Sequence, residues 1–183
     1  MVHMDSVEDR IADATLALLR SGGPRAVTVE AVAAASGVAK TTIYRRHRDR
    51  REVLSAALSR VASPPPIDPD ASATDRLRWL ITQAVEAVSG GVGLGGVAAM
   101  LTDEDPEFTT LFRRILVQQR ERLEAVIDVG KADGGLRPDL DNAALLDAIV
   151  GAYLAEHART GAVAVQWQER LFVLLWPAVQ PVG

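Results

Sequence analysis

The chain has 183 residues, enough for one domain or for a small domain followed by a larger one. Apolar residues make up 48% of it, so a substantial core can form, and the absence of cysteine excludes disulfides, thiol catalysis and cysteine-bound metals. Residues 1–60 hold ten basic and seven acidic residues, whereas residues 61–183 hold ten and seventeen. A basic segment on an otherwise acidic chain indicates a directed electrostatic footprint for a partner, rather than general polycation behaviour.

The first predicted helix runs from about residue 5 to residue 20. Ser6 and Asp9 have the spacing of a capping box, and apolar residues follow at helical spacing on one face. The stretch Gly22–Pro24 then ends the helix. Alanine, leucine and valine dominate the rest of the chain, and no run alternates β-branched with polar residues, so we expect an all-α fold.

Residues 28–54 predict two short helices joined at a glycine and followed by a dense run of arginines. Thr28 suits the N-cap of the first helix, and Gly37 stands where a left-handed backbone conformation would end it. Ile43 is apolar and can pack the second helix onto the first. This layout is that of a helix-turn-helix whose second helix enters the major groove of DNA.

The same segment resembles the DNA-binding domain of the TetR family of transcriptional regulators. The matching positions are Thr28-Val29-x-x-Val32-Ala33-x-x-Ser36-Gly37-Val38-Ala39-Lys40-Thr41-Thr42-Ile43-Tyr44-Arg45-Arg46 and then Arg50-x-Glu52-Val53-Leu54. The resemblance covers about residues 8–60. The rest of the chain is similar to the family only in its helical architecture and in short sequence segments such as Gly135–Asp141. One position departs from the pattern: His47 stands where family members usually carry Phe or Trp, so it either packs under the recognition helix or faces phosphate.

Nine residues are predicted to contact DNA, both by their chemistry and by the resemblance. The start of the recognition helix, which reaches the groove floor or its flanking phosphates, holds Lys40, Thr41, Thr42 and Tyr44. Arg46 is the leading candidate for a bidentate contact to guanine, and Arg45 takes that role if the helix is rotated differently. The predicted phosphate contacts, which set the register without reading the base sequence, are Thr28, Arg48 and Arg50.

A cluster of prolines at Pro64–Pro69 marks the predicted domain boundary, because it cannot continue a helix. We expect a three-helix helix-turn-helix DNA-binding domain over residues 5–62, a proline-rich linker over residues 63–71, and a larger helical domain for effector binding and dimerisation over residues 72–180. A long helix in the larger domain should begin near Asp105-Pro106, with proline in its first turn.

The two last predicted helices cover about residues 142–159 and 165–176. Residues 171–176 are six apolar residues in succession, and a helix that is apolar all round has to be buried on several sides. So close to the end of a small domain, this favours a subunit interface over a monomer surface. We therefore expect a homodimer formed through these two helices.

Seven of the eight aromatic residues lie after residue 60, so the larger domain has the bulky side chains that line cavities. Each of these residues also suits an ordinary core. The candidates for lining an apolar ligand pocket are Trp79, Met100, Phe108, Phe112, Tyr153, His157 and Trp167.

The sequence predicts no catalytic site, no metal site and no cofactor. The three histidines do not have the spacing of a helical metal pair, and the acids before Pro106 suit a helix cap. Residues 91–96 match G-x-G-x-x-G, but no strand precedes them, so a flexible helix-helix connection is expected at 89–96 instead of a dinucleotide site. No segment approaches the roughly 20 uncharged apolar residues of a membrane span, and the N-terminus lacks a signal peptide's apolar region.

Together these features predict a cytoplasmic, homodimeric transcriptional regulator: a repressor that a small apolar ligand releases from double-stranded operator DNA. Two alternatives remain. One is a DNA-binding regulator of the same fold that has no small-molecule effector. The other is an all-α enzyme or adaptor that does not bind DNA and whose basic segment is incidental.

Overall fold

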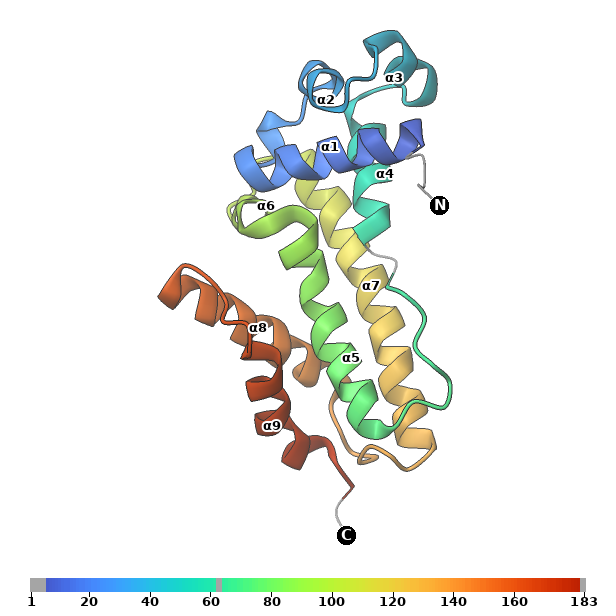
Figure 1. Cartoon of the computed structure of the whole chain (residues 1–183), viewed down its shortest axis with the longest axis vertical. Helices are drawn as coiled ribbons and strands as arrows, with labels where there is room; N and C mark the ends of the chain where they lie inside the picture. The colour runs from blue at the N-terminus through green and yellow to red at the C-terminus, as the bar shows by residue number, and fades with distance from the viewer. Residues whose placement is uncertain (1–5, 62–63, 182–183) are drawn as a thin grey trace. The chain divides into compact units, whose positions relative to one another are not determined.

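In this computed structural model, residues 6–61 and 64–181 are described, and their regular structure is entirely helical, which confirms the all-α prediction (Figure 1). The helices in chain order are α1 (Val7–Gly22), η1 (Pro24–Ala26), α2 (Val29–Ser36), α3 (Lys40–Arg46), α4 (Arg50–Val61), α5 (Ala73–Glu86), η2 (Ala87–Val92), α6 (Gly93–Leu101), α7 (Pro106–Ala132), α8 (Asn142–Thr160) and α9 (Trp167–Val179).

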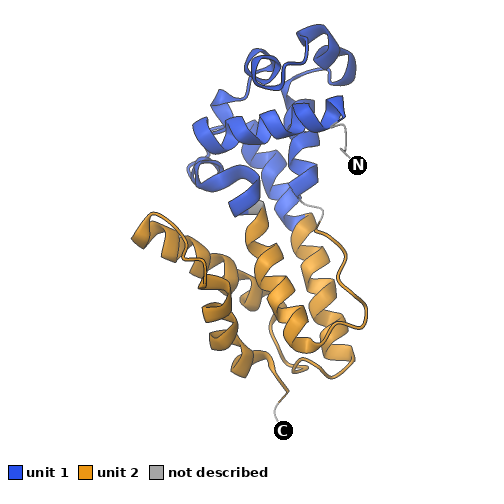
Figure 2. Ribbon diagram, in the orientation of Figure 1, with its two compact units in different colours: residues 1–63, 87–117 blue, residues 64–86, 118–183 orange. Residues whose placement is uncertain are grey.

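The chain packs as two compact units that do not follow chain order (Figure 2). One comprises residues 1–63 and 87–117, and the other comprises residues 64–86 and 118–183. The run α5–η2–α6 and the helix α7 therefore each contribute to both units. The division of the chain at 5–62, 63–71 and 72–180 stays a prediction, and the described part of that linker, residues 64–71, contains no helix.

The first helix begins with the capping box expected from its sequence. The Ser6 hydroxyl accepts a hydrogen bond from the Asp9 N–H at 3.1 Å, and the Asp9 carboxylate accepts one from the Ser6 N–H at 2.9 Å. The helix starts at Val7 and runs to Gly22, two residues beyond the predicted end, because the break comes only at Gly23, where φ is +71°. The predicted start at residue 5 lies outside the described residues.

The glycine-rich segment 89–96 is helical, and the expected flexible connection is wrong. The chain passes from α5 through the π-helical turn η2 directly into α6. Gly91 allows close packing, since a Cβ there would lie 2.5 Å from Cγ1 of Val61, and Gly93 has a φ of +69° where the two helices join. Arg20 of α1 binds η2 by donating from Nη1 to the carbonyls of Gly90 (2.7 Å) and Gly91 (3.2 Å).

The second unit has a core between α5, the later turns of α7, α8 and α9. Its fully buried residues include Leu80, Ile127 and Ile149. Gln119, which is buried, donates from Nε2 to the backbone carbonyl of Gln83 at 3.0 Å. This bond ties α7 to the last turn of α5, just before η2.

The last two helices differ slightly from their predicted bounds. The helix α8 ends at Thr160 before a left-handed Gly161, one residue later than expected. The helix α9 starts at Trp167 and not at 165, because Val165 lies in a turn and is almost fully exposed. It continues to Val179 through Pro177, whose missing N–H removes only one intrahelical hydrogen bond near the helix end.

By length and composition alone, the helical run Ala73–Leu101 could cross a membrane. The core helix of a globular protein passes the same test. Here α5 packs against α8 and α9 within one unit, and α6 packs against α1 within the other. Packing in these two cores therefore explains why the run Ala73–Leu101 is apolar.

Candidate DNA-binding interface

The helix-turn-helix is built by local interactions that the sequence encodes. Thr28 caps α2, because its hydroxyl accepts a hydrogen bond from the Ala31 N–H at 3.1 Å. Gly37 ends the helix in the left-handed conformation, with φ at +67°. The side chains of Val32 and Ile43 are fully buried, which fixes α3 against its neighbours by an apolar contact face.

The start of the recognition helix α3 presents polar side chains to solvent. Lys40, Thr41 and Tyr44 are exposed, whereas Thr42 is half-buried. The Lys40 ammonium lies 3.3 Å from a carboxylate oxygen of Glu30, which also lowers the pKa of Glu30 after the larger effect of backbone hydrogen bonding. The residues predicted to face the groove therefore lie on a helix that has an outer face accessible to solvent.

The two candidate base readers differ in their surroundings. The Arg45 side chain is exposed and makes no hydrogen bond or ion pair within the described residues. Arg46 is paired with Glu8 of α1, with 2.6 Å between Nη1 and Oε1. Of the two candidates, Arg45 is therefore the one whose guanidinium is not held by a carboxylate among the described residues.

His47 lies immediately after α3 and is buried. Its backbone N–H donates to the Ile43 carbonyl at 2.8 Å, and its Nε2 lies 3.2 Å from Oε2 of Glu8. Of the two roles left open by the sequence, burial fits packing under the recognition helix. Glu8 therefore holds Arg46 with one oxygen and His47 with the other.

Of the predicted phosphate contacts, Thr28 and Arg48 are exposed; the Arg48 side chain is 90% accessible. The Arg48 N–H donates to Oε2 of Glu52 at 2.7 Å, and the Glu52 N–H in turn donates to Oδ1 of Asp49 at 2.9 Å. These bonds begin α4 and leave the Arg48 guanidinium facing solvent. Arg51, which sequence reasoning did not select, is also exposed and has no partner in the described part of the chain.

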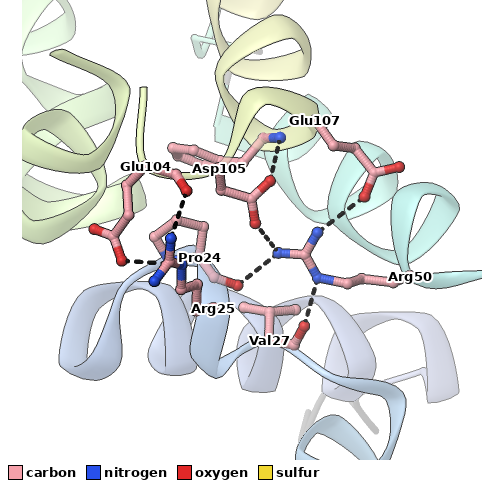
Figure 3. A network of polar contacts seen from close by, with 8 residues as sticks. Pro24, Arg25, Val27, Arg50, Glu104, Asp105 and Glu107 are labelled. Atoms are coloured by element: carbon pink, nitrogen blue, oxygen red, sulfur yellow. Dashed lines mark hydrogen bonds and ion pairs between the residues drawn. The ribbon is translucent and has the colours of Figure 1, made fainter. Parts of the chain in front are cut away.

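Arg50 is placed differently from the phosphate contact expected there. Figure 3 shows its guanidinium surrounded by acceptors from the same unit. Nε donates to the Val27 carbonyl at 2.7 Å, and Nη2 donates to the Pro24 carbonyl at 2.7 Å. Nη2 also lies 2.6 Å from Oδ2 of Asp105, and Nη1 lies 2.9 Å from Oε2 of Glu107. In this structure the Arg50 guanidinium is therefore engaged by acceptors of the protein itself.

Asp105 has a second role at the beginning of α7. Its Oδ1 accepts a hydrogen bond from the Phe108 N–H at 3.0 Å. Burial alone would raise the pKa of Asp105, but that hydrogen bond and the Arg50 guanidinium outweigh burial and hold the pKa below its usual value. The carboxylate thus stays ionised and couples the start of α7 to Arg50.

The candidate ligand residues are divided between the two units. Phe108 and Phe112 are fully buried and stack at 5.5 Å between ring centroids. Like Met100, they belong to the unit that contains the helix-turn-helix. In the other unit, Tyr153 meets Trp167 edge-on at 5.5 Å.

His157 lies beside this pair, 6.4 Å from the Tyr153 ring. Burial first, and then the negative charge of Glu86, raise the pKa of Tyr153. Trp79 of the same unit is half-buried, and its Nε1 has no hydrogen-bond partner among the described residues. Tyr153, His157 and Trp167 therefore come together, whereas the full set of seven does not form one cluster within either unit.

An open surface groove of about 840 Å³ runs along α8 and α9. Its lining includes Trp167 and two apolar side chains that face solvent, Val173 (64% exposed) and Leu174 (71% exposed). An exposed stripe of α8 carries small residues at helical spacing: Ala144, Ala148, Gly151 and Ala155. No group of three or more histidine, aspartate or glutamate side chains within residues 6–61 and 64–181 has the arrangement of a metal site.

Comparisons with known proteins agree with this geometry. Residues 11–57 match the model of bacterial regulatory proteins of the tetR family, and residues 67–171 match the model of a tetracycline repressor-like C-terminal domain. No curated protein matches the chain.

Solved structures share the fold. A putative TetR-family transcriptional regulator from Vibrio parahaemolyticus is 22% identical with a TM-score of 0.55, over 96% of this chain and 99% of the other. The regulator FadR from Bacillus subtilis, solved with stearoyl-CoA, is 18% identical with a TM-score of 0.63, over 91% and 96%. A putative regulator from Saccharomonospora viridis, solved with choline, is 19% identical with a TM-score of 0.61, over 94% and 97%.

Proposed function

Because the chain belongs to the TetR family of bacterial regulatory proteins, we propose that it is a homodimeric repressor that leaves its operator when a small apolar ligand binds. Members of this family are transcriptional regulators and not enzymes, and they bind DNA. The observation that carries the proposal is the exposed face of α3, where Thr41, Tyr44 and the unpaired Arg45 lie on a capped and packed helix-turn-helix. We expect the protein to act in the cytoplasm, where its DNA is.

Arg45 is the proposed base reader, through a bidentate contact to guanine in the major groove. Lys40, Thr41, Thr42 and Tyr44 would reach the groove floor and its flanking phosphates, and Arg46 would join them after leaving Glu8. Thr28 and Arg48 are the proposed phosphate contacts. Two copies of this interface on a two-fold axis would read half-sites about 34 Å apart.

The proposed dimer forms through α8 and α9. Support comes from the exposed apolar pair Val173 and Leu174 beside the small-residue face of α8. Small residues let two helix backbones approach closely, and the apolar pair would leave water on association. An isologous contact of this kind uses the same patch on both subunits, as a two-fold operator requires.

The proposed effector site lies in the unit that holds α8 and α9, around Tyr153, Trp167 and His157. These residues offer aromatic surface with a phenol and an imidazole to orient a ligand. The neighbours solved with stearoyl-CoA and with choline bind chemically different molecules, so the fold alone does not select one. Apolar side chains dominate the described core here, which supports a largely apolar ligand.

A footprint on the DNA flanking the protein's own gene tests the regulator proposal. We expect protection of two half-sites on one face of the duplex, and we expect Arg45→Ala to cost about 1–3 kcal/mol at one guanine position. Arg46→Ala is the matched comparison, because it removes the same group from the adjacent residue. Unchanged affinity after both substitutions would contradict the proposal and support the all-α protein that does not bind DNA.

A regulator of the same fold without a small-molecule effector is the second candidate. The mutual packing of Phe108 with Phe112 and of Tyr153 with Trp167 favours it, since filled aromatic clusters also build ordinary cores. A thermal-shift screen separates the two candidates. A ligand that binds only the folded state raises the melting temperature, and the same ligand should weaken operator binding.

A further inference from the structure

Arg50 has almost no unused hydrogen-bonding capacity. A guanidinium carries five N–H donors, and four hydrogen bonds from Arg50 reach acceptors of its own unit: two backbone carbonyls and two carboxylates. The carboxylates of Asp105 and Glu107 also bring two negative charges against its single positive charge. A phosphate approaching this side chain would have to displace them and would meet their repulsion.

The two carbonyls that Arg50 holds lie in the turn just before α2. Pro24 begins η1, and Val27 directly precedes the N-cap residue Thr28 (Figure 3). In that turn the Val27 N–H also bonds to the Pro24 carbonyl at 3.1 Å. The direction of α2 and the place of Thr28 therefore depend on a turn that Arg50 pins from α4.

We propose that Arg50 is a positioning residue for DNA binding: held by Asp105 and Glu107, it fixes the Pro24–Val27 turn and so the register at which Thr28 meets the DNA backbone. The inference rests on the proposed function, since it takes Thr28 as a phosphate contact. It extends that function to α7, because Asp105 and Glu107 influence operator binding without touching DNA.

Asp105→Asn separates this role from a phosphate contact. Asparagine still caps α7, but it removes the charge that holds Arg50. We expect operator affinity to fall about tenfold, the scale of one lost charge-assisted hydrogen bond, with a much smaller change on non-specific DNA. The slope of log K against log salt should stay unchanged, since no phosphate contact made by a cation is lost.

Other outcomes overturn the proposal. If Arg50 were a phosphate ligand restrained by Asp105, the substitution would release it and raise affinity for both DNAs. If Asp105 mattered only for folding, both affinities would fall in parallel together with the melting temperature. The matched control is Asp103→Asn, which removes the same charge two residues earlier from an exposed side chain outside the contacts of the Pro24–Val27 turn and should change operator affinity less than twofold.

Arg50→Lys provides a second, independent test. Lysine keeps the positive charge and serves phosphate as a point charge, but it cannot reach four acceptors in a fork. We expect it to lose operator affinity as strongly as Arg50→Ala. Operator affinity within about twofold of the wild type would assign Arg50 to phosphate and contradict the proposal.

Amide hydrogen exchange without DNA distinguishes failure of this inference from failure of the proposed function. Residues 25–31 should exchange about tenfold faster in Asp105→Asn than in the wild type or in Asp103→Asn. If the wild type binds its operator but exchange in Asp105→Asn equals that of the wild type, the positioning role alone is overturned. Lack of operator binding by the wild type would instead overturn the proposed function, and with it the link from Arg50 to DNA.

Discussion

Glu8 reaches two consecutive residues at the end of the recognition helix. Its Oε1 lies 2.6 Å from Arg46, and its Oε2 lies 3.2 Å from the His47 ring. Before Arg46 can bind guanine or phosphate, its ion pair with the Glu8 carboxylate has to break. Arg45 has no such partner to give up among the described residues. The two adjacent arginines therefore differ in what it costs them to reach DNA.

Glu8→Gln should strengthen operator binding by up to about fivefold, because the competing ion pair is half-exposed and worth less than about 1 kcal/mol. Titration of labelled operator DNA measures the change. The same substitution in an Arg46→Ala background should bring no gain, since the arginine that it releases is absent. Weaker binding of Glu8→Gln would mean that Glu8 orients Arg46 for DNA instead of restraining it.

The lowered pKa of Asp105 predicts how stability depends on pH. The folded pKa lies below the unfolded value of about 3.9, so the carboxylate stabilises the fold fully above that value. The contribution is lost as pH falls through the folded pKa. Denaturant titrations below about pH 4 should therefore show a steeper loss of stability for the wild type than for Asp105→Asn. Parallel pH profiles would contradict this assignment.

Contacts that are local in the chain were predictable from the sequence, and contacts between distant residues were not. The capping roles of Ser6, Asp9 and Thr28 follow from spacings of three residues. Glu8 and Arg46 are separated by 38 positions, and Arg50 and Asp105 by 55. No local pattern signals such pairs. The sequence alone therefore could not show that the Arg50 guanidinium is bonded to acceptors within the protein.

At the scale of elements, the glycine-rich segment is where sequence reasoning failed. Glycines within a helical run are destabilising by propensity, so a connection was the natural expectation. In the structure they permit close approach: Gly91 packs against Val61, and Gly93 adopts the positive φ at which η2 joins α6. Whether glycines interrupt a helix or allow it to pack closely depends on the neighbouring helices, and these are distant in the chain.

Gly91→Ala should destabilise the protein by about 1–3 kcal/mol, because the new Cβ would lie 2.5 Å from a methyl group of Val61. Gly95→Ala is the matched control from the same segment. A Cβ at Gly95 meets nothing closer than 3.8 Å, so that substitution should stabilise α6 by about 0.5–1 kcal/mol. Equal effects of the two in denaturant unfolding would show that the segment is not closely packed.

The exposed face of α9 predicts an effect of charge on assembly. Leu174→Glu should convert the proposed dimer into a monomer, since a carboxylate would be buried without a partner in the interface. Because Leu174 is exposed in the single chain, the monomer should keep its helical content. Val129→Glu on α7 puts the same charge on an exposed valine that does not line the α8–α9 groove, and it should leave the mass in sedimentation unchanged.

At the scale of the whole molecule, the dimer should be visible in the salt dependence of binding. Log K falls with log salt by about 0.9 per phosphate neutralised, and a dimer engages two half-sites. The Leu174→Glu monomer should therefore show about half the slope of the wild type on the same operator. An unchanged slope would mean that one subunit makes all the phosphate contacts.

The class of fold was predictable because helical periodicity, capping residues and the helix-turn-helix spacing are all properties of nearby residues. The packing of the helices into units was not. Sequence composition places a break at the prolines 64–69, and the described residues there are indeed free of helix. The core on its N-terminal side, however, takes in residues 87–117, which come after that break.

This arrangement limits how the protein can be dissected. A fragment ending at the proline-rich segment would keep α1 to α4 but would lose η2, α6 and the first turns of α7, which belong to the same packing unit. It would leave Arg50 without either carboxylate and Arg20 without its carbonyl acceptors, and it would expose apolar surface of α1 and α4 to water. The recognition helix is thus carried by a unit that only the longer chain completes, and natural or engineered truncations after residue 62 should yield an aggregation-prone fragment instead of a minimal DNA-binding module.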